Sequence, residues 1–294
     1  MKKYAAFALT LVLAGAAWAA QAASPPAQQP PAGPAQPAAS RPPQAKTKPE
    51  LDDYQAILQN PDLSAAETAA DVFGTKYPDS ELIGYLYAAL QRKYQAANNS
   101  DKTVEIGRKA LKYLPDHPIA LVLTADRIAE LTRESDLDRD ERYAESTKYA
   151  QHSLEVMDAA LPAIAGNVSP EQMQQAKKDL RSIAYNVLGV VHLNKKDYPA
   201  AEENFRNAAE ANPAQPDPYV FYRLSLAQDH QKKYADALKA VNRCLELAAA
   251  DDPVVPLAKQ EQSRLNKLVG APAPAAPSTP PSQPTPQTPS PSGK

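Results

Sequence analysis

Apolar side chains recur at every third or fourth position from about Leu51 to Leu268, and Ala, Leu, Glu, Gln and Lys dominate this stretch. Such spacing places the apolar side chains on one face of a helix. No segment alternates apolar and polar residues between turn residues as a half-buried strand would. Proline marks the points where one helix has stopped, in Asn60-Pro61-Asp62, Tyr77-Pro78-Asp79, Leu114-Pro115-Asp116, Asn212-Pro213 and Asp252-Pro253. We therefore predict an all-α fold built from short helices.

Two consecutive units of similar sequence occupy residues 182–215 and 218–251. The first unit carries aromatic, aliphatic and small residues at fixed spacing, at Tyr185, Leu188, Gly189, His192, Tyr198, Ala201, Phe205, Ala208 and Pro213. The second fills the corresponding positions with Phe221, Leu224, Ser225, Gln228, Tyr234, Ala237, Val241 and Cys244. Small side chains at such positions let two helices approach closely. We predict that both sets pack between helices, with the Cys244 thiol buried as a compact apolar group.

Weaker copies precede these two units. One contains Tyr87, Leu90, Tyr94, Ala110 and Pro115, with Thr103 and Gly107 in the places of the alanine and the phenylalanine. Residues 117–160 would form a divergent pair whose inter-helix loop is enlarged by about nine residues, and residues 50–77 a short capping pair. The sequence leaves open whether 117–181 is a true repeat or an inserted helical hairpin.

The spacing of the two best units resembles the signature of the tetratricopeptide repeat (TPR) family, strongly over 182–250 and weakly elsewhere between 50 and 269. The resemblance implies a right-handed α-solenoid of antiparallel helix pairs, in which the first helices line a concave groove. Grooves of this family bind extended peptides or helices of other proteins. Carried over by position, the partner-binding groove would hold Tyr85, Arg92, Gln95, Asn186, Val190, Asn194, Tyr219, Tyr222 and Asp229.

The composition of these groove positions indicates the kind of partner. Some family members use paired lysine and asparagine residues to clamp a carboxylate. The predicted groove positions lack these pairs, so we do not expect capture of a free C-terminus. We interpret the lining instead as mixed tyrosine and aliphatic, as at Tyr85, Tyr219, Tyr222 and Val190. Such a lining suits a peptide or helix with apolar anchors.

The amino-terminal residues are typical of a secretory signal peptide. Lys2 and Lys3 precede an apolar run, and Ala20 and Ala22 fit a cleavage site, so we predict a signal peptide over 1–22. The run is too short and too rich in alanine to favour a retained membrane span. We expect a bacterial protein that is periplasmic or secreted and has no integral membrane span after cleavage.

Proline-rich sequence flanks the predicted solenoid of residues 50–269. Nine of the 30 prolines lie in 25–49 and nine in 272–291. Segments with so little apolar surface do not form a packed core. We predict a disordered Pro/Ala/Gln-rich linker over 23–49 and a disordered Pro/Ser/Thr-rich tail over 270–294, both acting as tethers.

Charge and chemistry narrow the function classes. All 34 acidic residues lie between Glu50 and Glu261, so the predicted solenoid is acidic, and nucleic acid is not an expected partner. One cysteine and four histidines leave little for a zinc site, and the calcium-like spacing of Asp136, Asp138 and Asp140 meets Glu141 where a glycine is required. No nucleotide-binding, hydrolase or metalloprotease motif occurs. We expect no metal, no cofactor and no catalytic residue.

We therefore predict an exported scaffold or adaptor that binds a peptide or helix of a cell-envelope protein, in an envelope or secretion assembly or as a free periplasmic scaffold. The alternative is a ligand-binding protein or enzyme that uses the solenoid as a frame. That alternative requires a closed cavity with convergent titratable groups, whereas a scaffold requires an open groove. The partner and the oligomeric state are not determined by the sequence.

Overall fold

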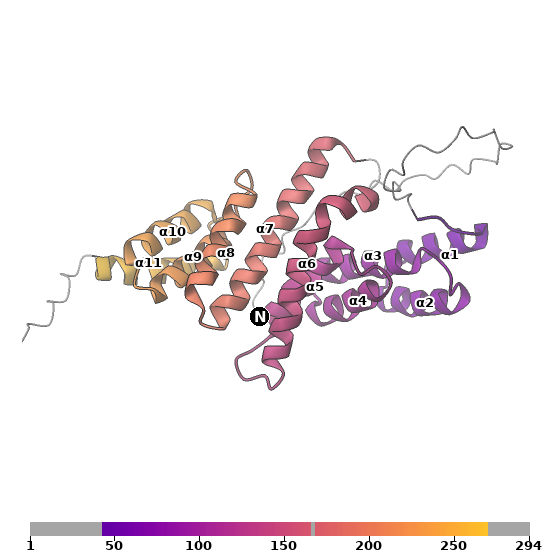
Figure 1. Cartoon of the computed structure of the whole chain (residues 1–294), viewed down its shortest axis with the longest axis horizontal. Helices are drawn as coiled ribbons and strands as arrows, with labels where there is room; N and C mark the ends of the chain where they lie inside the picture. The colour runs from indigo at the N-terminus through magenta and orange to yellow at the C-terminus, as the bar shows by residue number, and fades with distance from the viewer. Residues whose placement is uncertain (1–42, 166–167, 270–294) are drawn as a thin grey trace, which may run out of the picture.

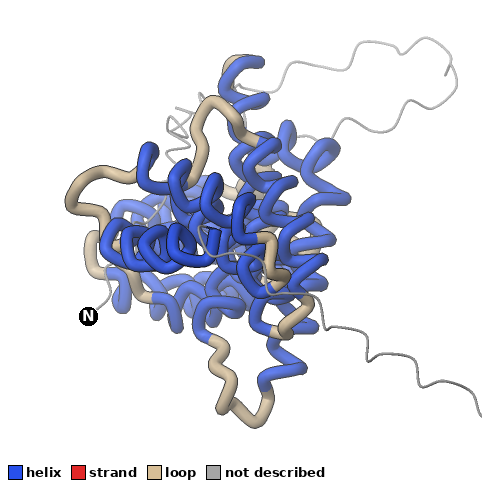
Figure 2. The backbone as a smooth tube through the Cα atoms, turned by 90° about the vertical axis from the view of Figure 1, so that its left-hand side faces the viewer, coloured by secondary structure: helices blue, strands red, loops and turns tan. Residues whose placement is uncertain are grey.

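The computed structural model describes residues 43–165 and 168–269, and within these ranges it contains only helices, turns and loops (Figure 2). The helices are α1 (Lys48–Gln59), α2 (Leu63–Lys76), α3 (Ile83–Ala96), α4 (Ser100–Tyr113), α5 (Pro118–Leu131), α6 (Arg139–Ala165), α7 (Pro170–Asn194), α8 (Tyr198–Ala211), α9 (Pro218–His230), α10 (Tyr234–Leu247) and α11 (Val254–Val269). Consecutive helices pack against each other along the chain and form an elongated row (Figure 1). The predicted all-α solenoid is confirmed.

Polar N-cap residues start several helices, and one of them, Asp62, lies in a predicted break. Asp62, Asn99 and Asp197 each accept a backbone hydrogen bond from the first turn of the helix that follows, as N-cap residues do. Thr47 and Glu50 form a capping box at the start of α1. This helix begins at Lys48 and so takes in the last two residues of the predicted linker, while the predicted signal peptide and tail lie outside the described residues.

Three helix pairs share one turn, at the end of α3, α7 and α9. Asn98, Lys196 and Lys232 follow α3, α7 and α9 with φ of 56°, 65° and 61°. The next residue donates a backbone hydrogen bond to the carbonyl five positions earlier, for example Asn99 to Tyr94 at 3.0 Å. This is the Schellman arrangement, in which a left-handed residue closes a helix end. It turns the chain back within three residues.

Small residues set the spacing inside the pairs. Ala201, Ala208 and Ala237 are at most 1 % exposed, and Phe205 is fully buried. The other predicted packing residues Leu188, Gly189, Leu224 and Cys244 are also buried, and Tyr185 is half-buried. Pro213 differs, because it lies exposed in the turn after α8 and ends the helix instead of packing.

The helices α6 and α7 are much longer than their neighbours, with 27 and 25 residues. The helix α6 pairs with α5, and α7 pairs with α8, so both belong to the repeats. Their extra turns form a hairpin that rises beyond the row of shorter helices (Figure 1). Met157 and Leu161 of α6 pack there with Ala176 and Leu180 of α7.

The sequence predicted a loop enlarged by about nine residues between the two helices of the third pair, α5 and α6. This prediction is wrong, because most of the extra residues lengthen the helices instead of the loop. The connector between α5 and α6 covers 132–138, only four residues longer than the three-residue turns of the other pairs such as 97–99. The remaining extra residues continue the helices. Within the described ranges, no helix has the length and apolar character needed to cross a membrane.

Candidate functional site

The odd-numbered helices form the inner wall of the solenoid. In the described part of the chain the backbone of each of them comes close to that of the next, from α1 through to α11. The backbones of successive even-numbered helices stay farther apart, and long side chains such as Lys109 on α4, which pairs with Asp71 on α2, bridge them. In a curved stack the elements on the concave side lie closest together. The concave face is therefore built by α1, α3, α5, α7, α9 and α11.

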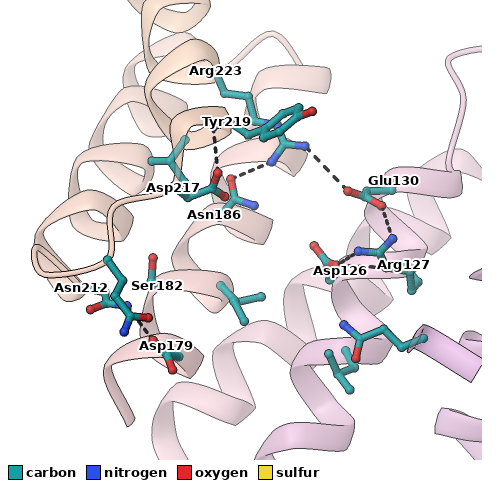
Figure 3. A pocket seen from close by; sticks show the side chains of 15 residues that line it. Asp126, Arg127, Glu130, Asp179, Ser182, Asn186, Asn212, Asp217, Tyr219 and Arg223 are labelled. Carbon is teal, nitrogen blue, oxygen red and sulfur yellow. Dashed lines mark hydrogen bonds and ion pairs between the residues drawn. The ribbon is translucent and has the colours of Figure 1, made fainter. Parts of the chain in front are cut away.

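A polar pocket opens on this face near the middle of the chain (Figure 3). It lies between α3, α5, α7 and α9, with the turn before α9 as part of its rim. The hollow measures about 810 Å³ with its open mouth included. Its lining consists of Gln95, Leu123, Asp126, Arg127, Glu130, Asp179, Ser182, Ile183, Asn186, Asn212, Gln215, Asp217, Tyr219, Val220 and Arg223.

The α5 wall of the pocket carries three charged residues. Arg127 donates from Nε to Asp126 Oδ2 at 3.0 Å and forms an ion pair from Nη1 to Glu130 Oε2 at 2.7 Å. Asp126 is 9 % exposed, and the side chains of Arg127 and Glu130 are 20 % and 24 % exposed. One guanidinium thus sits between two carboxylates.

The opposite wall is formed by α7 and α9, which a side-chain bridge connects. Arg223 Nη1 donates to Asn186 Oδ1 at 3.0 Å, and Arg223 Nη2 lies 3.8 Å from Glu130 Oε1. Asp217 caps α9 and accepts from the backbone N–H of Tyr219 at 2.8 Å. Figure 3 shows Asp217, Asn186 and Glu130 facing the same space.

A second set of polar groups occupies the end of the pocket near the long hairpin. Asp179 Oδ1 accepts from Gln175 Nε2 at 2.8 Å and from Asn212 Nδ2 at 2.6 Å. Ser182 donates its hydroxyl to the carbonyl of Ala208 at 2.8 Å. These bonds hold the start of the α8–α9 turn against α7.

Burial shifts the acids of the pocket toward their neutral forms. Burial raises the pKa of Glu130 to about 7, and the negative charge of Asp126 adds to the effect. The pKa values of Asp179 and Asp217 are raised as well, in both cases by burial first. The pocket holds four carboxyl groups and two guanidinium groups, so its carboxylates exceed its fixed positive charges.

Three of the predicted groove residues line this pocket, namely Gln95, Asn186 and Tyr219. Tyr219 also donates its hydroxyl to Asp252 Oδ1 at 2.9 Å, which ties α9 to the start of α11.

Two more predicted residues form a neighbouring cluster on the same face. The ring centroids of Tyr85 and His117 are 6.2 Å apart in an edge arrangement, and Arg92 lies near Tyr54 and His117. Arg92 is half-buried and makes no ion pair within the described residues. Burial lowers the pKa of the Arg92 guanidinium.

The structure places the other four predicted groove residues outside the pocket. Val190 packs between repeats, and Asn194 is exposed at the end of α7. Tyr222 packs with the core between α9, α10 and α11. Asp229 forms an ion pair with Arg264 of α11. The last helix therefore covers the positions that the resemblance assigned to an open groove in the final repeat.

The charged residues of the α5 wall were missing from the sequence prediction because no groove positions were assigned in the divergent third pair. If α5 is counted from Pro118 in the same way as the other first helices, the ninth and thirteenth positions are Asp126 and Glu130. The signal was present once the helix start was known. Asp179 lies in the extension of α7, for which the repeat signature has no position.

Comparison with known proteins adds a likeness of fold. No protein-family model matches the sequence, and no curated protein does. The assembly chaperone of RpL4 (Acl4, residues 1–338) is 17 % identical, with 76 % of this chain and 84 % of that chain covered and a TM-score of 0.50.

Two further solved structures are similar at lower TM-scores. TTC0263, a thermophilic TPR protein of Thermus thermophilus, is 14 % identical, with 75 % of this chain and 98 % of that chain covered and a TM-score of 0.39. PilW, a widely conserved type IV pilus biogenesis factor, is 18 % identical, with 76 % and 91 % covered and a TM-score of 0.44. The repeat signature, the helix pairs in series and the likeness to Acl4 show that the chain has a TPR-like solenoid fold.

Proposed function

We propose that this chain is an exported protein-interaction scaffold that binds an extended segment or a helix of a partner protein along its concave face. The polar pocket between α3, α5, α7 and α9 is the observation that carries the proposal. It lies on the inner wall of the curve, and the first helices of four successive pairs line it. A chain laid along the groove would therefore contact several repeats at once.

The amino-terminal sequence supports export. Lys2 and Lys3, the apolar run and Ala20 and Ala22 together fit a cleaved signal peptide. We propose a periplasmic or secreted location and a partner in a cell-envelope or secretion assembly. Mass spectrometry of the protein purified from its host would test this, with a mature chain beginning at Ala23 expected. Recovery of the intact chain with Met1 in the cytosolic fraction would contradict it.

The residues that line the pocket support a binding protein over the alternative of an enzyme. Its lining includes no cysteine or histidine, and the Ser182 hydroxyl is donated to a backbone carbonyl. Asp126 and Glu130 are both held by Arg127. The arrangement therefore pairs no nucleophile with a free base, which supports binding rather than catalysis.

A pocket-filling variant tests the binding proposal. Gln95→Trp on α3 would place a large ring at the wall of the pocket, while Gln174→Trp places the same ring on an exposed position of α7. Both full chains, and the wild type, are immobilised and exposed to envelope extract of the host. We expect the wild type and Gln174→Trp to retain the same proteins and Gln95→Trp to lose them. Equal retention by Gln95→Trp would overturn the groove assignment.

A further inference from the structure

Some acidic residues of the pocket have a cationic partner and others do not. Arg127 and Arg223 are both engaged with Glu130, while Asp179 and Asp217 make no ion pair within the described residues. Asp179 accepts only from amide groups, and Asp217 only from a backbone N–H. Two half-buried carboxyl groups thus face the pocket without an ion pair, and Asp217 feels the charge of Arg223 only from farther away. A buried carboxylate without a cationic partner is destabilising, and a cation supplied from outside would relieve this.

A second group in the pocket has a hydrogen-bond donor left over. Asn186 is only 8 % exposed, and its Oδ1 is occupied by Arg223. That bond orients the amide so that Nδ2 remains a donor. Within the described ranges Nδ2 makes no hydrogen bond, although Asn186 lines the pocket. A neutral acceptor such as a peptide carbonyl would satisfy this donor, whereas a free cation would not.

The carboxyl groups of Asp179 and Asp217 and the amide of Asn186 together favour one kind of occupant. The carboxyl groups require a cation, and the amide requires an uncharged acceptor close to it. A lysine or arginine residue within a peptide supplies both, through its side chain and its backbone carbonyl. We propose that the pocket binds a lysine or arginine side chain of the partner, with Asp217 and Asp179 as acceptors and Asn186 as donor to the partner backbone.

This inference rests on the proposed function and adds the charge of the partner to it. It also departs from the apolar anchors expected from the sequence, because the pocket on this face is acidic. A metal ion is a weaker fit, since no group of three or more His, Cys, Asp or Glu among the described residues is arranged to hold one.

The test measures binding of capped peptides to the full chain. A positional-scanning library of acetylated and amidated hexapeptides contains no terminal charges, so any charge preference comes from side chains. We expect lysine or arginine at one position to increase affinity at least about tenfold over norleucine, the contribution of one charge-assisted hydrogen bond. The preference should weaken as salt is added.

Matched variants assign the preference to the pocket. Asp217→Asn keeps an N-cap residue but removes the charge, and Asp62→Asn makes the same change at the exposed cap of α2. We expect Asp217→Asn to lose about tenfold in affinity for the basic peptide but not for its norleucine analogue, and Asp62→Asn to bind both as the wild type does. Asp179→Asn provides a second test if Asp217→Asn does not fold.

The outcomes separate this inference from the proposed function. Binding of peptides without preference for lysine or arginine would overturn the cation site and leave the groove assignment standing. A basic preference that persists in both Asp217→Asn and Asp179→Asn would also overturn it. Butylamine, which carries the charge of a lysine side chain but no carbonyl group, would overturn the role of the peptide backbone if it bound as tightly as the best peptide. If no peptide of the library and no host protein binds the full chain, the proposed function itself fails.

Discussion

Gly189 of α7 lies directly against the ring of Phe205 on α8, so close that a Cβ on Gly189 would be 2.5 Å from the ring carbon Cε1. The ring is fully buried. The two helices therefore approach each other at a distance that only glycine permits at this position.

Alanine at this position should destabilise the protein. Gly189→Ala gains about 1 kcal/mol of helix propensity, but overpacking a rigid core costs about 1–3 kcal/mol. We expect a net loss of stability in urea unfolding. Gly74→Ala is the matched control, because no atom lies within 4 Å of a Cβ built at Gly74 on α2. That variant should gain stability, and a gain for Gly189→Ala as well would contradict the packing account.

The repeat units could be predicted because the residues that pack within a helix pair recur at fixed spacing in the sequence. Gly189, Ala201 and Phe205 lie within one helix pair, and the short turn between α7 and α8 brings them together. The coverage of Tyr222 and Asp229 was not predictable in this way. It depends on α11, whose sequence carries no repeat signature and whose contacts come from helix packing.

His117 should make the protein sensitive to acid. It is 6 % exposed, and its Nδ1 accepts from the backbone N–H of Ala120 at 3.1 Å. Burial, followed by the charge of Arg92, lowers the pKa of His117 to about 4. The unfolded chain therefore takes up the proton first, and stability falls as the pH drops from about 6.5 toward 4.

The variant His117→Asn keeps an N-cap and removes the titration. Relative to the wild type, it should gain up to about 3 kcal/mol between pH 7.5 and pH 4, the free energy that corresponds to a pKa lowered from 6.5 to about 4. His152→Asn should show the opposite slope, because the hydrogen bond to Asp116 at 2.7 Å raises the pKa of His152. Urea unfolding at several pH values measures both slopes, and equal slopes would contradict this prediction.

Glu130 should have the reverse effect of His117. Its pKa is raised to about 7 by burial and then by Asp126, so the folded protein holds the proton more tightly than the unfolded chain. Stability is then lost as the pH rises from about 4.5 to about 7. Glu130→Gln should remove this loss, and its melting temperature should rise relative to the wild type over that pH range. A difference that does not change with pH would contradict the burial of a charge in the pocket.

The helix α11 should depend on Arg264, which pairs with Asp229 of α9 and with Glu261 of its own helix. Asp229 has a side chain 16 % exposed that pairs with Arg264, and its Oδ1 is buried without a hydrogen bond in the described structure. Arg264→Gln leaves this carboxylate without its cation, which we expect to cost about 1–3 kcal/mol. The exposed pair of Arg243 and Glu246 is the control, and Arg243→Gln should change stability by less than about 0.5 kcal/mol. Similar losses in both variants would contradict the assignment.

The acidic character of the pocket could not be predicted from the repeat signature alone. Asp126 and Glu130 belong to the most divergent pair, Asp179 to the extension of α7, and Asp217 to a cap. They meet only because α5, α7 and α9 lie side by side on the concave face. The overall solenoid follows from local patterns, whereas the chemistry of its inner wall follows from how three separate helices are stacked.

The central claim is that the partner lies on the concave face, and site-specific photocrosslinking in the host tests it most directly. A photoreactive amino acid is placed at Gln95 or Gln215, which line the pocket, and at Lys112 or Glu203, which are exposed on the even-numbered helices α4 and α8. We predict a crosslinked partner, the same in each case, from Gln95 and Gln215 and none from Lys112 and Glu203. Crosslinking of that partner from the even-numbered helices, with none from the pocket, would contradict the account.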